Sequence, residues 1–344
     1  MYYSKHSNNR KFMKNKKVLI IGGAGYVGRV VSSEFLIKGY GVRILDNCIY
    51  PQIKKKFTIK NLNFEFIYGD KENLKTLEKA LIDINYVVML SGLVGDPITK
   101  KYPALSKKIN IDATKKCLRF INKSKVERLI FISTCSNYGV TKKQIPVDEK
   151  NVLNPISAYA KAKVEVEKYL IKNKNKLNFS FTILRFATAF GYSPRMRFDL
   201  TVNQFVKDIY LGKKIDLYDA DTWRPYCHVK DFASAIDRVF KVKKKLIDGN
   251  IFNVGRNENN FSKLSIIKLI IKKMKKGKYQ IVKNSKDRRN YIVNFSKIKK
   301  ILKFSPKLSI SYGITEILSQ FKKRNIKLSE INKLGNYRVS KKFL

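Results

Sequence analysis

A tyrosine and a lysine one helical turn apart are spaced to transfer a proton. Tyr159 and Lys163 form the pattern YxxxK, and residues four apart lie on one face of a helix. We expect the Lys163 ammonium to lower the tyrosine pKa from its free value of about 10, because a positive charge favours the phenolate. The tyrosine would then take a proton from a hydroxyl group, or return it to a carbonyl, as a hydride moves. Thr134 ends an apolar run upstream and is expected to hold the reacting oxygen beside Tyr159.

A glycine-rich turn offers a binding place for a diphosphate. The apolar run Val18–Ile21 leads directly into a GxxGxxG motif that begins at Gly22 and ends at Gly28. Glycine lets backbone N–H groups at a helix N-terminus approach a phosphate with no side chain in the way. The motif lies between a predicted strand and a predicted helix, as dinucleotide binding requires; an ordinary glycine-rich turn is the alternative. The residues predicted to contact a dinucleotide here are Gly22, Gly25, Tyr26, Val27 and Gly28.

Acidic residues end the next two predicted strands. Asp46 follows Gly28 by 18 residues, and an acid there can accept hydrogen bonds from both ribose hydroxyls of the cofactor. It would also repel a 2′-phosphate, which favours NAD over NADP. Asp70 is placed to contact the adenine. The alternatives are that Asp46 caps a turn with Asn47 and that Asp70 caps the helix predicted at 74–82.

Alternating apolar and amphipathic segments predict the fold that positions these residues. Strands separated by helices indicate βαβ crossovers, so the fold class is α/β, a Rossmann-type doubly wound parallel sheet. The regular alternation ends near Gly191. We expect an NAD-binding Rossmann domain at 16–190, interleaved with a smaller C-terminal α/β substrate-binding lobe at 191–325. Strands are predicted at 18–21, 42–45, 64–67, 86–90, 128–133 and 179–185, and helices at 26–38, 74–82, 104–122, 158–172, 200–211, 229–242, 262–275 and 309–321.

The composition limits the class of protein further. Of 344 residues, 44% are apolar, which supports a sizeable core and excludes a wholly disordered chain. No run approaches the roughly 20 apolar residues that span a bilayer, so membrane insertion is not expected. The N-terminal segment has no apolar core typical of a signal peptide. The four cysteines are widely spaced, so we expect neither a disulfide framework nor a metal site, and a cytoplasmic location fits.

Positive charge is in large excess. The chain has 73 Lys and Arg against 26 Asp and Glu, a net charge of +47, and such an excess is typical of proteins that bind polyanions. The basic residues occur on almost every segment, however, which indicates solvated faces, and nucleic acid is not an expected partner. Segments 1–15 and 326–344 are predicted to be mobile basic tails. A Rossmann protein that binds polyanions through these tails is the alternative that is not an enzyme.

The motifs together resemble a known family. The glycine turn, the segment Ser133–Gly139 (STCSNYG), YxxxK and the segment Arg224–Asp231 (RPYCHVKD) occur in the order and spacing of the extended short-chain dehydrogenase/reductases. Within that family the chain is similar to the NAD-dependent nucleotide-sugar epimerases and dehydratases, from about residue 16 to residue 321. The resemblance implies bound NAD, a nucleotide-diphosphate sugar as substrate, and a homodimer formed through helices 104–122 and 158–172.

The resemblance also assigns residue roles. The resemblance assigns catalysis to Thr134, Tyr159 and Lys163. Of these, Tyr159 and Lys163 would also contact the cofactor. The cofactor set gains Asn47, Leu90, Ser91, Gly92 and Asn110, the last of which steadies the site. The substrate set comprises Thr134, Ser136, Asn203, Arg224, Arg288 and Arg289, with the arginines clamping a diphosphate through paired hydrogen bonds. Arg195 and Arg197 follow the sixth predicted strand and could meet a phosphate or a sugar carboxylate at the cleft mouth; an ordinary surface loop is the alternative.

One departure from the family pattern narrows the reaction. Sugar 4,6-dehydratases resembling this chain carry an acid just after the catalytic threonine, whereas Cys135 and Ser136 occupy those positions here. Neither is an adequate acid, so elimination is disfavoured. Epimerisation at C4, through transient oxidation to a keto-sugar and re-reduction, needs no such acid, and neither does a simple reduction or oxidation of the sugar. Cys135 is expected to pack rather than react, and His228 is expected to pack and hydrogen-bond.

Overall fold

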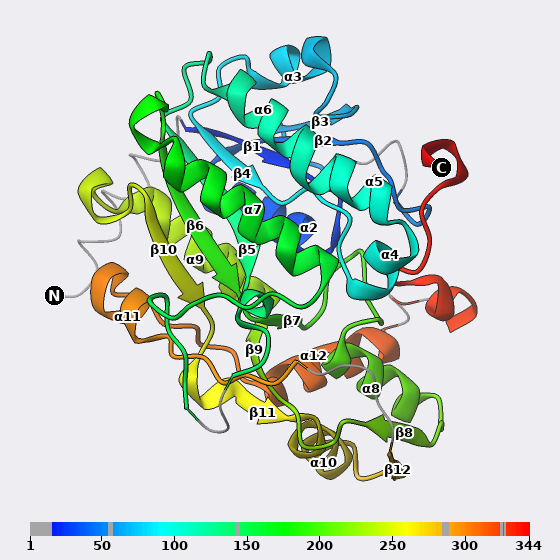
Figure 1. Ribbon diagram of the computed structural model, residues 1–344. Coiled ribbons are helices and arrows are strands. Elements are labelled where there is room, and N and C mark those ends of the chain that lie inside the picture. The colour runs from blue at the N-terminus through cyan, green and yellow to red at the C-terminus, as the bar shows by residue number, and fades with distance from the viewer. Residues whose placement is uncertain (1–15, 54–57, 142–144, 284–288, 324–325, 327) are drawn as a thin grey trace, which may run out of the picture.

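A parallel sheet with helices on both faces dominates the computed structural model, which describes residues 16–53, 58–141, 145–283, 289–323, 326 and 328–344 (Figure 1). Within these ranges the sheet has seven strands in the order β10-β6-β5-β4-β1-β2-β3, and every neighbouring pair is parallel. The doubly wound parallel sheet predicted from the sequence is therefore confirmed. The strands are β1 (Lys17–Ile21), β2 (Gly41–Asp46), β3 (Phe64–Tyr68), β4 (Tyr86–Met89), β5 (Arg128–Thr134), β6 (Ser180–Phe186) and β10 (Asn250–Val254).

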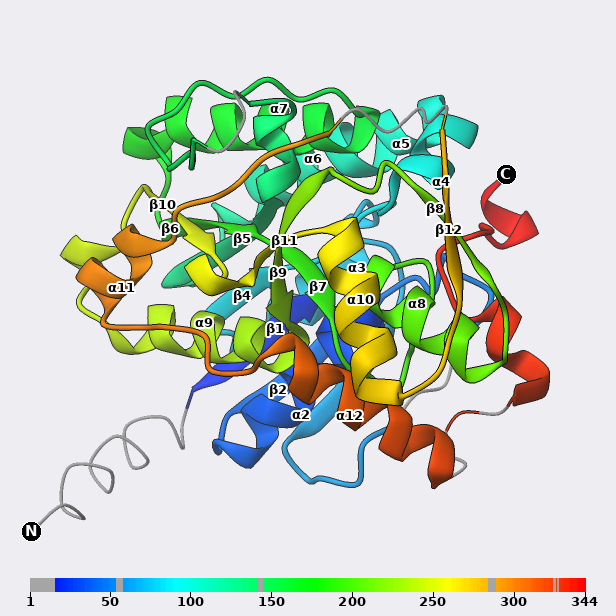
Figure 2. The same cartoon turned by 90° about the horizontal axis from the view of Figure 1, so that it is seen from below.

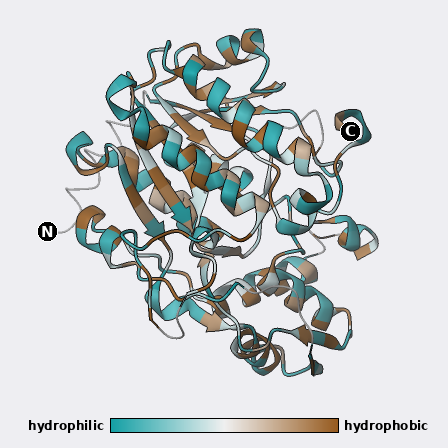
Figure 3. Ribbon diagram, in the orientation of Figure 1, coloured by the Kyte–Doolittle hydropathy of each residue, from teal (hydrophilic) through white to brown (hydrophobic). Residues whose placement is uncertain are grey.

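The central strands are apolar along most of their length because helices bury both faces of the sheet. Figure 3 shows these strands in brown between helices whose outward sides are teal. On one face, Phe35 of helix α2 (Tyr26–Ile37) packs edge-on against Phe240 of helix α9 (Val229–Lys241), with ring centroids 6.1 Å apart. On the other face, Leu118 and Val166 belong to a second buried cluster. The helices are α2 and α9 on the first face, and α3 (Leu74–Leu81), α6 (Ala113–Ile121) and α7 (Ala158–Lys172) on the second.

Two of the differences from the sequence-based prediction concern the large sheet and its helices. The strand β10 was not predicted, because its five residues include two asparagines; Asn253 is nevertheless fully buried and accepts a hydrogen bond of 2.9 Å from the Tyr138 hydroxyl. The helix predicted at 104–122 is interrupted. It consists of α5 (Pro103–Lys107), a π-helical turn (Lys108–Asp112) and α6. π-helical turns often occur at functional sites, and this one contains Asn110.

The lobe lies beside the carboxyl edge of the sheet (Figure 2). Its core contains side chains such as Phe198, Val202, Ile266 and Ile314, which are all fully buried. Within the described ranges, no helix combines the length and apolar character needed to cross a bilayer. The lobe and the segments around it contain α4 (Asp96–Lys101), β7 (Thr188–Phe190), α8 (Thr201–Tyr210), β8 (Ile215–Tyr218), β9 (Trp223–His228), β11 (Asn260–Ser262), α10 (Lys263–Met274), β12 (Tyr279–Val282), α11 (Ser296–Leu302) and α12 (Ile310–Lys322).

The chain does not divide cleanly in sequence between sheet and lobe. After β9 it returns to the large sheet, since α9 packs against α2 and β10 pairs with β6. The interleaving of the two parts therefore extends at least to residue 254.

The end of the chain is packed against the protein rather than extended as a tail. We call residues 333–344 the C-terminal segment; it runs from the lobe toward α4 (Figures 1 and 2). Val339 is 6% exposed, and the Ser340 amide donates a hydrogen bond of 2.9 Å to the Ile49 carbonyl. The prediction of a mobile tail at 326–344 is therefore wrong for its described residues. The predicted tail at 1–15 lies outside the described residues.

Candidate active site

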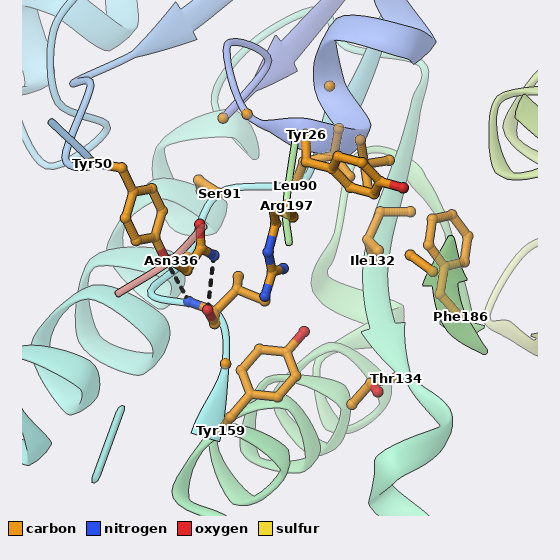
Figure 4. A pocket seen from close by; sticks show the side chains of 18 of the residues that line it. Tyr26, Tyr50, Leu90, Ser91, Ile132, Thr134, Tyr159, Phe186, Arg197 and Asn336 are labelled. Carbon is orange, nitrogen blue, oxygen red and sulfur yellow. Dashed lines mark hydrogen bonds between the residues drawn. The ribbon is translucent and has the colours of Figure 1, made fainter. Parts of the chain in front are cut away.

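A cavity opens at the carboxyl ends of β1, β2, β4, β5 and β6, where the sheet meets the lobe (Figure 4). Ligands of open α/β sheets bind at this edge. The structure brings together residues that are far apart in the sequence. The predicted site residues that line the cavity are Gly22, Gly25, Tyr26, Val27, Gly28, Asp46, Asn47, Asp70, Leu90, Ser91, Gly92, Thr134, Ser136, Tyr159, Lys163, Arg195, Arg197, Arg224 and Arg289.

The glycine turn has the geometry of an anion site. Gly22 adopts φ +87°, and a Cβ there would lie 2.6 Å from the backbone of Ser91. A Cβ at Gly28 would lie 2.5 Å from the backbone of Gly23, so the helix can approach the turn only with glycine at this position. Gly25 caps α2 with no side-chain hydrogen bond, and the first turn of α2 has no acid. The free N–H groups and the positive end of the helix dipole therefore face the cavity, which fits a cofactor diphosphate.

The acids beyond β2 and β3 form a connected polar wall. Asp46 accepts hydrogen bonds from the amides of Ala24 (3.0 Å) and Cys48 (2.8 Å), so it also caps a turn. Burial raises the pKa of Asp46 above its ordinary value, against the effect of these hydrogen bonds. Asn47 donates a hydrogen bond of 2.6 Å to Asp70. Asp70 does not cap α3, because the Asn73 side chain does so by accepting from the Thr76 amide. This wall can accept hydrogen bonds from a ribose and an adenine, so these acceptor groups fit NAD.

The residues predicted to be catalytic meet at the other end of the cavity. In Figure 4 the Tyr159 hydroxyl and the Thr134 side chain project into the same space, one from α7 and the other from the end of β5. The first turn of α7 is fixed by Ser157, whose hydroxyl accepts a hydrogen bond from the Ala160 amide. The Lys163 ammonium donates a hydrogen bond of 2.8 Å to the Ile132 carbonyl and lies 5.8 Å from the centroid of the Tyr159 ring.

Burial dominates the protonation of the tyrosine–lysine pair. It raises the pKa of Tyr159 above its ordinary value, and the charge of Arg197 opposes this rise. Burial, together with the nearby charge of Lys71, lowers the pKa of Lys163 to about 7, whereas Glu167 opposes that decrease. The predicted lowering of the tyrosine pKa by Lys163 is therefore wrong for this arrangement: the Tyr159 pKa is raised, and Arg197 rather than Lys163 is the cation that opposes the rise.

Lys71 is a residue that the sequence analysis missed. It follows Asp70 directly and lines the cavity although it is only 5% exposed. Its ammonium donates hydrogen bonds to the hydroxyls of Ser91 (3.0 Å) and Thr114 (2.8 Å), and burial lowers its pKa. Nothing in the residue pattern around Asp70 indicates that this lysine faces inward.

A buried polar network lies beneath the residues predicted to be catalytic. Arg185 on β6 forms a salt bridge of 2.7 Å with Glu167, one helical turn beyond Lys163. Glu167 also accepts hydrogen bonds from Ser133 and from Asn137. Because this network joins α7 to the end of β5, it fixes the helix that carries Tyr159 relative to the strand that carries Thr134.

The lobe side of the cavity is rich in arginine, and each cation has a defined neighbour. Arg197 forms an ion pair with Asp199 at 2.5 Å, and Arg289 forms one with Asp96. Arg224 lies over the Tyr291 ring, 5.1 Å from its centroid, and donates to the Arg289 carbonyl. Arg195 lies over the Tyr50 ring at 5.0 Å. Tyr50, Asp96 and Tyr291 also line the cavity and were not predicted.

Two predicted site residues do not line the cavity. Asn203 is fully buried: its side chain accepts from the Gly191 amide and donates to the Tyr26 hydroxyl and the Arg197 carbonyl. Its predicted contact with a substrate phosphate therefore has no basis in the structure. Asn110 binds both the amide and the carbonyl of Leu93, so it orients the loop after β4 rather than touching a ligand. Arg288 lies outside the described residues.

Cys135 and His228 also lie away from the cavity lining. Cys135 is 1% exposed, its thiol donates to the Arg185 carbonyl, and burial raises its pKa well above the ordinary value. A buried protonated thiol is a poor nucleophile. His228 is fully buried, accepts a hydrogen bond from the Lys230 amide and lies 2.9 Å from a Glu316 carboxylate oxygen.

A doubly wound sheet with a phosphate-binding turn and a Tyr–Lys pair at its carboxyl edge defines a Rossmann-type, dinucleotide-dependent class of protein. The sequence profile described as "NAD dependent epimerase/dehydratase family" matches residues 18–255. The chain belongs to this NAD-dependent family, whose members include nucleotide-sugar epimerases, and the resemblance seen in the sequence is confirmed.

Known relatives agree with this assignment. The UDP-glucuronate 4-epimerase of Thermodesulfobacterium geofontis is 27% identical over 321 residues, which cover 90% of this chain and 97% of the relative. The solved UDP-glucose 4-epimerase of Thermotoga maritima with UDP-glucose has a TM-score of 0.79 and 26% identity, covering 90% and 99%. The UDP-glucuronic acid 4-epimerase of Bacillus cereus, solved with UDP-glucuronic acid and NAD, has a TM-score of 0.78 and 25% identity, with the same coverage.

Proposed function

We propose that this protein is a nucleotide-sugar 4-epimerase that keeps its NAD bound through the catalytic cycle. One observation carries the proposal: among the described residues that line the cavity, the catalytic end contains Thr134, Tyr159 and Lys163 but no glutamate. The carboxylates that do line the cavity are aspartates, and both on the lobe side are held by arginines, Asp96 by Arg289 and Asp199 by Arg197. Elimination of water needs a further free acid and base beside the sugar in addition to Tyr159, whereas epimerisation needs no acid or base beyond Tyr159.

The residues of this chain have separable tasks in that reaction. The Tyr159 oxygen takes the proton of the C4 hydroxyl, and later returns it to the keto oxygen. Thr134 orients that oxygen by a hydrogen bond from its hydroxyl. Bound NAD would supply the hydride acceptor and donor for C4, and the glycine turn, Asp46 and Asp70 would hold it in the cavity. Arg197 opposes, by its charge, the rise in the Tyr159 pKa that burial causes, and in this way it favours the phenolate that would act as the base.

The arginines on the lobe side support a diphosphate-linked substrate. Arg224 and Arg289 lie together beside Tyr291, and all three line the cavity. A guanidinium presents parallel N–H groups that match phosphate oxygens. Because Arg289 is already paired with Asp96, its orientation is set before a substrate arrives. The homodimer expected through α6 and α7 stays a prediction.

NAD retention separates the proposed epimerase from a dehydrogenase of the same family. The purified protein is denatured, and released NAD is measured by absorbance and mass. About one NAD per chain, followed by conversion of a UDP- or GDP-sugar to its C4 epimer without added cofactor, is the expected result. An empty protein that instead reduces added NAD with a nucleotide-sugar would assign a dehydrogenase. A protein that neither retains nor binds NAD would overturn the reading of the glycine turn.

A further inference from the structure

The C-terminal segment meets the loops that follow β2 and β4, at the half of the cavity that would bind adenosine diphosphate. Gln52 donates hydrogen bonds to the carbonyls of Lys333 (2.6 Å) and Gly335 (3.0 Å). Asn336 donates a hydrogen bond of 2.8 Å to the Val94 carbonyl, and the Val94 amide donates one of 2.9 Å to the Tyr50 hydroxyl (Figure 4).

The apolar anchor of this segment contacts the cofactor loops themselves. Val339 belongs to a buried cluster with Ala24 of the glycine turn, Cys48 just after Asp46, and Leu93 after β4. These are the loops that form the anion site and the ribose wall described above. The segment therefore packs against loops that build the cofactor end of the cavity.

Two buried polar atoms at this junction have no hydrogen-bond partner. They are Asn336 Oδ1 and Arg195 Nε, on side chains that are 6% and 4% exposed, and both residues line the cavity. Arg195 makes no ion pair with any described carboxylate; its contacts are the Tyr50 ring and two 3.4 Å hydrogen bonds, to Gln52 and to the Gly335 carbonyl. A buried guanidinium that no carboxylate contacts in an ion pair and a buried amide oxygen without a donor are both costly. A ligand with an anionic group and a hydrogen-bond donor would satisfy them.

We propose that the C-terminal segment is a clasp that holds the cofactor, with Arg195 binding the cofactor's diphosphate and Asn336 Oδ1 accepting a hydrogen bond from a hydroxyl or N–H group of the cofactor. This rests on the retained NAD of the proposed function. Ser193 places Arg195 over the glycine turn, since its hydroxyl donates to the Tyr26 carbonyl at 2.8 Å and accepts from the Arg195 amide. The diphosphate then lies between the N-terminus of α2 and a guanidinium that the segment holds in place. Release of the cofactor requires the segment to detach.

The test measures exchange of the bound cofactor. Holoenzyme is mixed with excess isotopically labelled NAD, and replacement of bound NAD is followed by mass spectrometry. Four variants are compared with the full chain: deletion of 333–344, Asn336→Ala, Arg195→Gln, and the control Asn332→Ala. Asn332 is an exposed asparagine just before the segment. The deletion keeps Ile331, which is buried in the lobe.

The clasp predicts at least tenfold faster exchange for the deletion, several-fold faster exchange for Asn336→Ala and Arg195→Gln, and no change for Asn332→Ala. Unchanged exchange in a deletion variant that retains its thermal unfolding midpoint would overturn the clasp. If the deletion variant does not fold, unchanged exchange in both point variants has the same meaning. A full-length protein that holds no NAD contradicts the proposed epimerase instead, so the two failures are distinguishable.

Discussion

The two ends of the cavity are built in different ways. The cofactor end is built mainly from backbone N–H groups of the glycine turn, Asp46 and Asp70, all within the first 70 residues. Hydrogen bonds from Ala24 and from Asn47 hold the two acids. The lobe end consists of side-chain cations from three distant segments, and two of them, Arg197 and Arg289, are already paired with aspartates. A phosphate at the first end meets a preformed backbone site, whereas a phosphate at the second meets arginines whose charge is partly balanced. We therefore expect tight, permanent binding at the first end and reversible binding at the second.

Tyr159 is the proposed proton carrier, and its removal should have the largest effect. Tyr159→Phe keeps the ring and removes the proton carrier, so we expect kcat to fall by roughly 10³-fold. Bound NAD per chain should stay the same, because the cofactor end is untouched. Steady-state epimerisation and NAD released on denaturation are measured on the same sample. Activity within tenfold of the unaltered protein would show that another group carries the proton.

Lys163 should show opposite effects on activity and on stability. Lys163→Met is expected to lower kcat by about 10²-fold and yet raise the free energy of unfolding of the NAD-free protein. The folded pKa of about 7 lies below the unfolded value of about 10.4. Below pH 7 Lys163 is protonated in both the folded and the unfolded protein, so the folded state carries the full cost of a buried charge. Between pH 7 and 10 the unfolded state binds the extra proton, so that cost disappears as pH rises.

Urea unfolding at pH 6 and pH 9 measures this difference. The stabilisation by Lys163→Met should amount to a few kcal/mol at pH 6 and be clearly smaller at pH 9. Lys161→Met, an exposed position on the same helix, is the control and should change neither quantity. Equal stabilisation at both pH values would mean that the lysine is not destabilised by burial.

Loss of an arginine at the lobe end should weaken substrate binding without releasing the cofactor. Arg289→Ala removes a cation that lines the cavity and frees Asp96, so we expect KM for the nucleotide-sugar to rise about tenfold with kcat within threefold. Arg119→Ala, on the exposed side of α6, is the matched control. If Arg289→Ala instead lost its NAD, the division of the cavity into two ends would be wrong.

The smallest effect is expected at the residue next to the catalytic threonine. Cys135→Ala removes a buried thiol that donates only to the Arg185 carbonyl, so activity should stay within about threefold of the unaltered protein. The packing loss should lower the unfolding midpoint slightly. A loss of activity beyond about 100-fold with an unchanged midpoint would give this thiol a chemical role.

A contrast between local spacing and long-range packing explains which parts of the site the sequence could predict. The glycine turn, Asp46 and the Tyr159–Lys163 pair are set by local spacing within one strand-turn-helix unit, so their placement follows from the pattern of residues. Tyr50, Lys71, Tyr291 and Asn336 reach the cavity through loop paths and tertiary packing, which no periodicity encodes. The position of Asn203 in the sequence suggests a ligand contact, but in the structure its side-chain amide forms hydrogen bonds with Gly191 and Tyr26 instead.

The late position of β10 in the chain has a consequence for how the protein forms. β6 pairs with β5 on one side and with β10 on the other, so its second edge stays open until residues 250–254 leave the ribosome. An unpaired parallel edge invites association with other chains, and long-range strand pairing is slow. A nascent chain that ends near Gly191 therefore lacks both the edge strand and the helix α9 that covers one face of its sheet. We expect it to aggregate, which would make the sheet and the lobe a single cooperative folding unit.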